Sequence, residues 1–115
     1  MDILTYEEAK EIYEMMNDHL DNTDEDIMDL YNTMIGKAVR YAHIRAGWPS
    51  LSRQEKQEQD SFRTAAHDGF ISLINGVART EGEAGRQWRE RLSQDRRRIG
   101  DFACYIALFE GISAR

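Results

Sequence analysis

Cysteine and proline are almost absent from this chain of 115 residues, which has one of each, Cys104 and Pro49. A single thiol excludes an internal disulfide and a multi-cysteine metal site, and it is typical of a protein from a reducing cytoplasm. β-Branched residues are also sparse, whereas Ala, Leu, Met, Glu, Gln and Arg dominate the sequence. Because these residues favour helices, we expect an all-α protein.

Long hydrophobic runs are missing as well. The longest wholly apolar run, residues 102–109 (FACYIALF), is well short of the ~20 residues that span a bilayer. The first residues, MDILTYEEAKE, are acidic and lack the basic and apolar regions of a secretory signal. With 41% hydrophobic and 31% charged residues, the sequence predicts one globular domain over residues 1–115, located in the cytoplasm and without a membrane partner.

The chain has no overall basic excess, since its formal net charge is −6. Residues 1–60 carry 14 acidic and 6 basic side chains, whereas residues 61–115 carry 7 acidic and 9 basic ones. An acidic helical hairpin beside a basic one would explain this difference, and so would a surface that offers both signs to a partner. Six arginines fall within residues 86–98, but Glu90 and Asp95 interrupt them, which favours a solvated helix face over a phosphate-binding track. Nucleic acid is therefore not the expected partner, and an arginine-mediated nucleic-acid accessory protein is kept as a third alternative function.

Start and stop signals divide the chain into four predicted helices. Thr5 and Glu8 have the spacing of a capping box, and the first helix is expected to reach about residue 20. Thr23 is the predicted cap of the second helix, which should run from about Asp24 to Ala46, where a Gly-Trp-Pro sequence terminates it.

The second half of the chain reads as a longer pair of helices. Ser52 and Glu55 form another capping box, and the third helix is expected to continue to about Arg79. Residues 80–85 (TEGEAG) then form the last turn, and the fourth helix runs on to about Ile112. Because short connections make neighbouring helices antiparallel, the sequence predicts an up-down-up-down four-helix bundle with long helices 3 and 4.

The last predicted helix carries an apolar seam with one charge in it. Steps of four and three residues connect its members, as in a helix stripe that packs against other helices. A charge in such a seam must find a partner, so Asp95 predicts a polar layer inside the bundle. The seam consists of Trp88, Leu92, Asp95, Ile99, Phe102, Ile106 and Phe109.

The third helix has a matching seam that changes from ionic to apolar: Arg63, His67, Phe70, Ile74 and Val77. Folding the two helices about a turn near residue 82 pairs positions whose numbers sum to about 164. The predicted pairs are Arg63 with Asp101, His67 with Arg97 or Arg98, Gly69 with Asp95, and Gly76 with Trp88.

Two interpretations of this layer stay open. It is either a satisfied charge network that fixes helix pairing, or a pocket that binds an anionic or polar small molecule. His67 with carboxylates could hold one divalent ion, but the Glu-x-x-His pairs of di-iron bundles are absent, and neither a metal nor a cofactor is predicted. The candidate ligand-binding residues are Arg63, His67, Asp68, Asp95, Arg98 and Asp101.

The short first helix is expected to leave one end of the bundle uncovered. Either Ile3 and Leu4 fold over this end, or another subunit does, and the second possibility predicts a homodimer. The apolar residues expected at this interface are Ile44, Trp48, Leu51, Phe62, Phe109 and Ile112.

No motif with a known chemistry stands out. GxSxG, P-loop, HExxH and CxxC patterns are all absent, so no catalytic residue is predicted. The favoured hypothesis is a small cytoplasmic helical-bundle protein that acts by self-association or by binding a protein partner. The alternative is a small-molecule or metal-binding bundle that uses the polar layer between helices 3 and 4.

Overall fold

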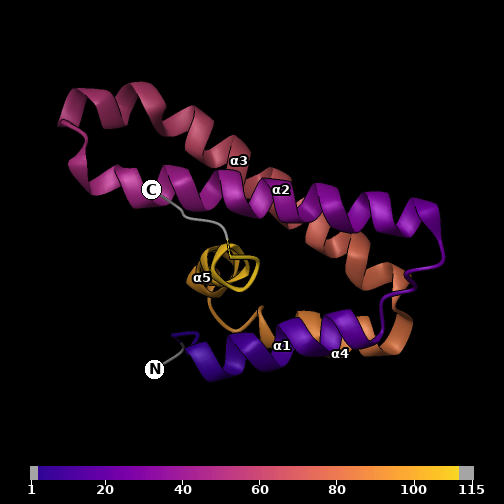
Figure 1. Ribbon diagram of the computed structural model, residues 1–115. Helices are drawn as coiled ribbons and strands as arrows, with labels where there is room; N and C mark the ends of the chain where they lie inside the picture. Colours follow the sequence, from indigo (N-terminus) through magenta and orange to yellow (C-terminus); the bar gives the residue numbers. More distant parts are fainter. Residues whose placement is uncertain (1–2, 112–115) are drawn as a thin grey trace.

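The structure is a computed structural model that describes residues 3–111, and all regular structure in this range is helical (Figure 1). The all-α prediction is confirmed, but the described chain has five α-helices rather than four. They are α1 (Tyr6–Asp18), α2 (Glu25–Gly47), α3 (Arg53–Thr80), α4 (Gly82–Arg91) and α5 (Arg96–Phe109), with a short 3₁₀-helix, η1 (Trp48–Ser50), between α2 and α3. None of these helices is both long enough and apolar enough to cross a membrane.

The first three α-helices begin at side-chain caps. The N–H of Glu8 donates to Thr5 Oγ1 at 3.2 Å, as predicted for α1. The cap of α2 is Asp24 rather than Thr23, because the Asp24 carboxylate accepts from the two N–H groups at the start of the helix. At α3 the Ser52–Glu55 capping box is present with both of its hydrogen bonds, at 2.8 and 3.1 Å.

The turn between α3 and α4 is tighter than predicted. Gly82 has a φ of 60°, a left-handed conformation that favours glycine, and α4 begins there instead of after residue 85. Gly85 lies against the backbone of α3, since a Cβ at this position would stand 1.9 Å from the carbonyl oxygen of Ala78. The Nε of Arg89 donates to Asn75 Oδ1 at 2.6 Å, which agrees with the predicted register close to the turn.

The predicted fourth helix is interrupted between α4 and α5. The N–H groups of Leu92 and Ser93 bond to carbonyls three residues back, at 3.0 and 2.9 Å, which tightens and ends α4. Asp95 then caps α5, with its carboxylate accepting from the Arg97 N–H at 2.8 Å. The prediction that Asp95 is a charge inside a packed seam is therefore wrong. Short polar side chains such as Ser and Asp bond to nearby backbone groups, and here this competition ends one helix and starts another.

The helices do not form an up-down-up-down bundle. In Figure 1, α2 and α3 run side by side across the view, α5 is seen almost along its axis beneath them, and α1 lies along α4. α2 packs against α3 and α5, whereas α1 packs against α4 and α5. The break after α4 makes this arrangement possible, because it lets α5 cross α2 instead of continuing along α3.

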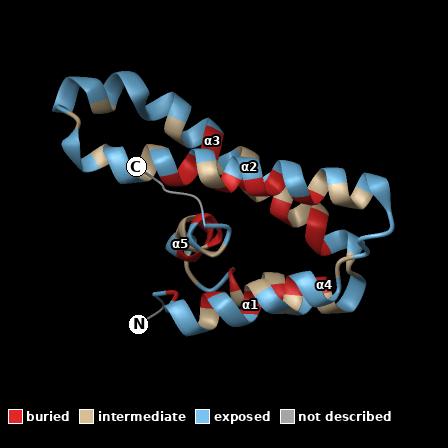
Figure 2. Ribbon diagram, viewed as in Figure 1, coloured by how far each residue is buried: buried red, intermediate tan, exposed pale blue. Residues whose placement is uncertain are grey.

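The core lies where α5 meets the other helices. All apolar seam positions of the last two helices are buried except Phe109, which is half-buried. In the α3 seam Phe70, Ile74 and Val77 are buried, while Arg63 and His67 are only half-buried, as their ionic character predicts. Figure 2 shows the consequence: buried residues gather where α2 and α3 approach the other helices, and the η1 end of this hairpin is mostly exposed.

Candidate anion-binding cleft

The six predicted site residues do not form one layer. Arg63, His67 and Asp68 line a single cleft, at the exposed half of α3. Asp95 and Asp101 stand beside it, each paired with an arginine that lines the cleft. Arg98 points to the other side of α5, where it binds α1.

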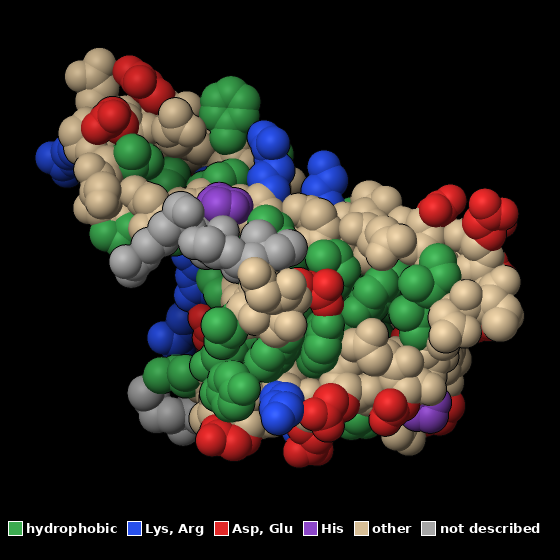
Figure 3. Space-filling model, viewed as in Figure 1, with side chains coloured by type: hydrophobic (Ala, Val, Ile, Leu, Met, Phe, Trp, Pro, Cys, Tyr) green, Lys and Arg blue, Asp and Glu red, His purple; other side chains and the backbone are tan. Residues whose placement is uncertain are grey.

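The cleft lies between the η1 end of the hairpin and the beginning of α5, and its volume is about 580 Å³. Figure 3 shows Lys or Arg side chains in the recess beneath the projecting end of the hairpin. Four of the lining residues are arginines, and Asp68 is the only acidic residue among them. The lining consists of Tyr41, Arg45, Trp48, Pro49, Arg63, Thr64, His67, Asp68, Arg96, Arg97 and Gly100.

Arg45 and Arg63 reach the cleft from the two arms of the hairpin. Arg45 NH2 pairs with Asp101 Oδ1 at 2.7 Å, so the predicted Arg63–Asp101 pair is wrong. Arg63 instead pairs with Asp60 at 3.0 Å, and its guanidinium carbon lies 4.6 Å above the centre of the Trp48 ring. The Nε of Arg63 is buried and has no hydrogen-bond partner within residues 3–111. This donor is therefore unsatisfied but shielded, and a ligand would contact the more exposed part of the guanidinium group.

Arg96 and Arg97 enter from the first turn of α5. Arg97 holds the Asp95 carboxylate through its Nε and NH2, both at 3.1 Å. Together with the Arg97 N–H, these contacts lower the pKa of Asp95 to about 2. Arg96 is exposed and forms no ion pair with the described part of the chain. Asp95 thus remains ionised and holds Arg97 in place, while Arg96 has its guanidinium free for a ligand.

Ring side chains form the rest of the cleft. The rings of Tyr41 and His67 lie with their centres 5.2 Å apart, and His67 Nδ1 is 3.7 Å from a carboxylate oxygen of Asp68. Gly100 lets α5 approach α2 closely, because a Cβ there would stand 3.2 Å from the Tyr41 ring and hydroxyl. His67 and Arg97 line the same cleft, and the predicted pairing of His67 with Arg97 or Arg98 stays a prediction.

Two of the predicted helix-pair contacts fail. The neighbours of a Cβ on Gly76 would be Leu30 and an Arg79 nitrogen rather than Trp88, and a Cβ on Gly69 would meet nothing within 4 Å. Both predictions assumed a continuous helix 4 lying along α3. Because α5 departs from α3 at Asp95, that register holds only near the turn.

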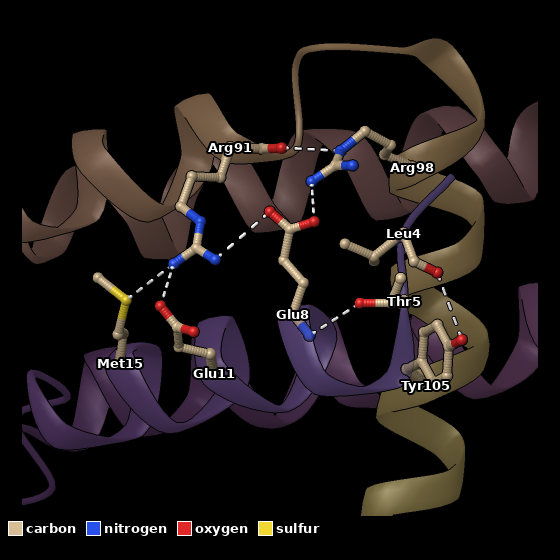
Figure 4. Close-up of polar contacts among 8 residues, drawn as sticks. All are labelled: Leu4, Thr5, Glu8, Glu11, Met15, Arg91, Arg98 and Tyr105. Carbon is tan, nitrogen blue, oxygen red and sulfur yellow. Dashed lines mark hydrogen bonds and ion pairs between the residues drawn. The ribbon is translucent and has the colours of Figure 1, made fainter. Parts of the chain in front are cut away.

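The buried ion pair of this protein lies outside the cleft and is shown in Figure 4. Arg98, only 3% exposed, pairs through NH2 with Glu8 Oε1 at 2.7 Å and donates from Nε to the Arg91 carbonyl at 2.9 Å. The other Glu8 oxygen lies 3.4 Å from Arg91 NH2, and Arg91 also bonds to Glu11 at 2.8 Å. The hydrogen bond from Arg98 is the main cause that lowers the pKa of Glu8 below its ordinary value. This network fixes α1 to the break between α4 and α5.

Some of the candidate residues connect helices through ion pairs. Arg98 joins Glu8 and Arg91 in the network at α1, and Asp101 pairs with Arg45 between α5 and α2. Glu8 was missed because its position after Thr5 explained it as part of a helix cap, and nothing in the sequence connects it to the far end of the chain.

The remaining cleft residues had a usable sequence signal. Tyr41, Arg45 and Trp48 are spaced by four and three residues, so they share one face of α2 and its extension, and they line one wall of the cleft. Arg45 could have been found from this spacing, whereas Arg96 and Arg97 depend on where α5 begins.

The metal-binding version of the alternative hypothesis has no candidate site here. Within residues 3–111, no group of three or more His, Cys, Asp or Glu side chains is placed to hold a metal ion.

The predicted apolar interface is divided between two places. Phe109 packs against the rings of Tyr6, Tyr13 and Tyr105, with centres 5.1–6.1 Å away. Leu4 is buried beside this cluster, where its carbonyl accepts from the Tyr105 hydroxyl at 3.3 Å, while Ile3 stays 49% exposed.

The other predicted interface residues belong to the hairpin. Ile44 and Phe62 line a groove between α2 and α3, and Phe62 is 60% exposed. Trp48 lies under Arg63 in the cleft lined by four arginines, which we name the arginine cleft. Leu51 is half-buried next to η1. Ile112 lies outside the described residues. The structure thus places the five described residues in separate clusters, and the homodimer interface stays a prediction.

Comparison with protein-family models, with curated proteins and with solved structures gives no match for this chain. The geometry of the cleft is thus the basis for assigning a function. Guanidinium groups from three directions can surround an anion, and the indole ring offers a flat surface next to them.

Proposed function

We propose that this protein binds a small phosphate-bearing ligand in the arginine cleft. One observation carries the proposal: Arg45, Arg63, Arg96 and Arg97 come from α2, α3 and α5 and line the same cavity. A guanidinium presents a rigid fork of N–H donors that matches the oxygens of a phosphate group. Here three helices place guanidinium groups around one cavity. This geometry suits an anion with several oxygens.

The ion pairs around the cleft are compatible with this role. The partners Asp60, Asp95 and Asp101 are not lining residues, so each carboxylate holds its arginine from outside the cavity. Ion pairs with this much solvent exposure are weak, and a guanidinium with five donors can bind a second anion while keeping the first. The exposed guanidinium of Arg96 supplies donors that no ion pair among residues 3–111 uses.

The Trp48 ring favours a ligand with an aromatic ring in addition to its phosphate. Trp48 is half-buried at the edge of the cleft and carries the Arg63 guanidinium over one face of its ring, so a ligand ring would use the other face or replace Arg63. A mononucleotide combines a stacking surface with a phosphate, and base stacking on an aromatic side chain contributes ~1–3 kcal/mol.

Intrinsic fluorescence tests the proposal directly. The chain has two tryptophans, of which Trp88 is fully buried, so a ligand added to the protein should change the emission of Trp48. Titration with inorganic pyrophosphate and with adenosine triphosphate should give saturable binding that weakens as salt is added.

The variant Arg63→Ala combined with Arg97→Ala should weaken binding by about 10-fold or more, since each lost charge-assisted hydrogen bond contributes ~1.5–3 kcal/mol. Arg40→Ala is the control, because Arg40 is an exposed arginine of α2 outside the cleft. Its removal changes the net charge by one, as does each of the two substitutions in the cleft. Equal weakening in the control would attribute binding to net charge and contradict the proposal.

A second candidate function, self-association, is favoured by the surface of the hairpin. Phe62 is 60% exposed beside Ile44 and Val39, on the part of α2–α3 where most residues are exposed (Figure 2). Two such hairpins packed about a two-fold axis would cover these side chains with a second copy and form four packed helices between subunits. A homodimer of this kind would retain the predicted mode of action by self-association.

Light scattering during size-exclusion chromatography tests the dimer. We expect the mass of a dimer for the unmodified chain and of a monomer for Phe62→Glu. Leu108→Glu is a matched control, since Leu108 is 58% exposed on α5, away from the hairpin groove. A monomer at high protein concentration would reject this second function without affecting the first.

A further inference from the structure

A second cavity borders the arginine cleft along α3. It lies between α3 and α4, has a volume of about 750 Å³ and is open to solvent. Three more arginines line it, with Glu90 as the only acidic lining residue. The lining consists of Asn75, Ala78, Arg79, Gly82, Arg86, Arg89, Glu90 and Ser93.

The two cavities follow one face of α3. Thr64 and Asp68 of the first cavity and Asn75 and Arg79 of the second are separated by four, seven and four residues, so they lie within about 60° around the helix axis. The α4–α5 connection also joins them, since Ser93 lines one and Arg96 lines the other. From Arg63 to Arg79 the helix rises ~24 Å. The two cavities thus lie one after the other along the same face of α3, and we name them together the basic groove.

Arg89 gives the second cavity an uncompensated charge. Its Nε donates to Asn75 at 2.6 Å and its NH1 to Ser93 at 3.0 Å, but it forms no ion pair with a carboxylate among residues 3–111. Burial lowers the pKa of this guanidinium, which reflects the cost of a cation that no neighbouring anion stabilises. An anionic ligand in the groove would supply the missing counter-charge.

Much of the negative charge of the chain lies away from the two cavities. Exposed acidic residues occur on α1, at the start of α2 and near the start of α3, and Figure 3 shows Asp and Glu side chains along the lower edge, at the right-hand end and at the projecting end of the hairpin. Screening in physiological salt confines the effect of a charge to about 8 Å, so a ligand in the groove experiences the lining residues and their direct partners. Four of the seven lining arginines pair with carboxylates inside this distance, whereas Arg79, Arg89 and Arg96 form no ion pair among residues 3–111.

We infer that the basic groove binds single-stranded nucleic acid, an inference that rests on the proposed function of the arginine cleft. Phosphates of one strand would follow the arginines along α3, and a base would stack on the Trp48 ring at one end. The spacing of phosphates in a stacked strand, 3.4 Å, gives room for about seven nucleotides over the length of the groove. The chain-wide acidic charge predicted no such partner, but the arrangement of the arginines in the fold favours one.

Fluorescence anisotropy with labelled oligonucleotides tests this inference. The probes are single-stranded DNA of about three and about ten nucleotides, and a polyphosphate of about ten phosphates serves as competitor. The longer oligonucleotide should bind at least about 10-fold more tightly than the shorter one, because only the longer strand reaches both cavities. Its affinity should fall with salt at a slope of roughly −0.7 for each phosphate contacted.

Variants at the far end of the groove separate this inference from the proposed function. Arg79→Gln with Arg86→Gln should remove the advantage of the longer strand and reduce the salt slope by roughly 1.4. The same variant should leave the affinity for adenosine triphosphate in the arginine cleft unchanged. Both residues are exposed, so folding is expected to persist. Lys37→Gln with Arg40→Gln, two exposed basic residues of α2 that line neither cavity, is the control of equal charge.

Several outcomes would overturn the inference. Equal affinity for short and long strands, or no effect of the Arg79 and Arg86 changes, would restrict binding to the arginine cleft and leave the proposed function intact. Polyphosphate competing as strongly as DNA would exclude a contribution of the bases and thus a nucleic-acid ligand. Absence of binding by every probe, adenosine triphosphate included, would reject both proposals.

Discussion

At the scale of single residues, Glu8 and Arg98 connect the two ends of the sequence. Arg98 is buried at the start of α5, and its charge is compensated by a carboxylate from α1 at 2.7 Å. Removing one member of such a pair leaves the other charge buried without a partner. The resulting loss of stability is larger than the net contribution of the pair. The same geometry in a solvent-exposed pair would contribute little.

We therefore expect Glu8→Ala to destabilise the protein by about 2–3 kcal/mol, somewhat less than for a fully buried pair because Glu8 is partly exposed. Glu8→Gln should cost less, since an amide oxygen can still accept from Arg98. Urea unfolding measures both changes. Glu11→Ala is the control: Glu11 is 64% exposed in its contact with Arg91, and its loss should change stability by less than about 0.5 kcal/mol. Equal effects of the two Ala variants would contradict a special role of the Glu8–Arg98 pair.

The same pair predicts a dependence of stability on pH. Arg98 lowers the pKa of Glu8 below its ordinary value of 4.5. A carboxyl whose pKa is lower in the folded state contributes stability above its unfolded pKa and loses this contribution as the pH falls through the folded pKa. The contribution of Glu8 to the free energy of unfolding should thus be constant near neutral pH. It should decrease as the pH falls below about 4.5. Glu8→Gln, which cannot titrate, should show a shallower decrease in unfolding experiments over this range.

At the scale of secondary-structure elements, two short segments redirect the chain. The Glu81–Gly82 turn places α4 directly against α3, and residues 92–95 end α4 so that α5 can cross α2. Both segments depend on local chemistry: a glycine with positive φ in the first, and Ser and Asp bonded to nearby backbone in the second. The direction of α5, and with it the arginine cleft, follows from these few residues.

Gly85 and Gly69 provide a test of helix packing. Gly85→Ala should destabilise the protein by at least about 2 kcal/mol, because its Cβ would collide with the Ala78 backbone of α3, which cannot move without separating the helices. Gly69→Ala should instead stabilise it by about 0.5–1 kcal/mol, since Gly69 is within a helix and a Cβ there meets no atom within 4 Å. Thermal melting of the two variants compares them directly, and a similar loss in both would refute the close approach of α4 to α3.

Asp95 tests the interruption between α4 and α5. As the cap of α5, Asp95→Ala should lower the melting temperature, while Asp95→Asn should remain close to the unmodified protein because Asn is an equally good N-cap. A charge buried in a packed seam would give a different result, with Asn also strongly destabilising because Arg97 would lose its counter-charge in a dry environment. The ratio of the two losses therefore distinguishes a cap from an interior charge.

At the scale of the whole molecule, the fold leaves the η1 end of the hairpin uncovered by α1 and α4. A compact four-helix bundle would have enclosed this end, but α5 turns away and the recess between it and the hairpin becomes the arginine cleft (Figures 1 and 3). The apolar groove with the exposed Phe62 is lined by other residues of α2 and α3, which face away from the basic cavity, so the hairpin carries a different surface on each face.

Helical content, most caps and the buried seams were determined by the sequence, because they depend on interactions a few residues apart. The Ser52–Glu55 box and the periodic burial of Trp88, Leu92, Ile99, Phe102 and Ile106 are examples. The sequence also shows the arginines of the candidate site, but it does not show which of them lie together in the fold. Arg98 and Arg97 are neighbours in the chain, yet one is buried against α1 and the other lines the cleft, since successive side chains of a helix point about 100° apart.

Only the tertiary structure decided which of these charges meet. Glu8 with Arg98, and Arg45 with Asp101, join residues far apart in the chain, and their pairing depends on the angle at which α5 leaves α4. That angle is set by three or four residues around Asp95, whose helical periodicity is continuous with that of the helices on both sides. Periodicity records which face of a helix is apolar, but it carries no information on where the axis bends, and here the bend creates the cleft.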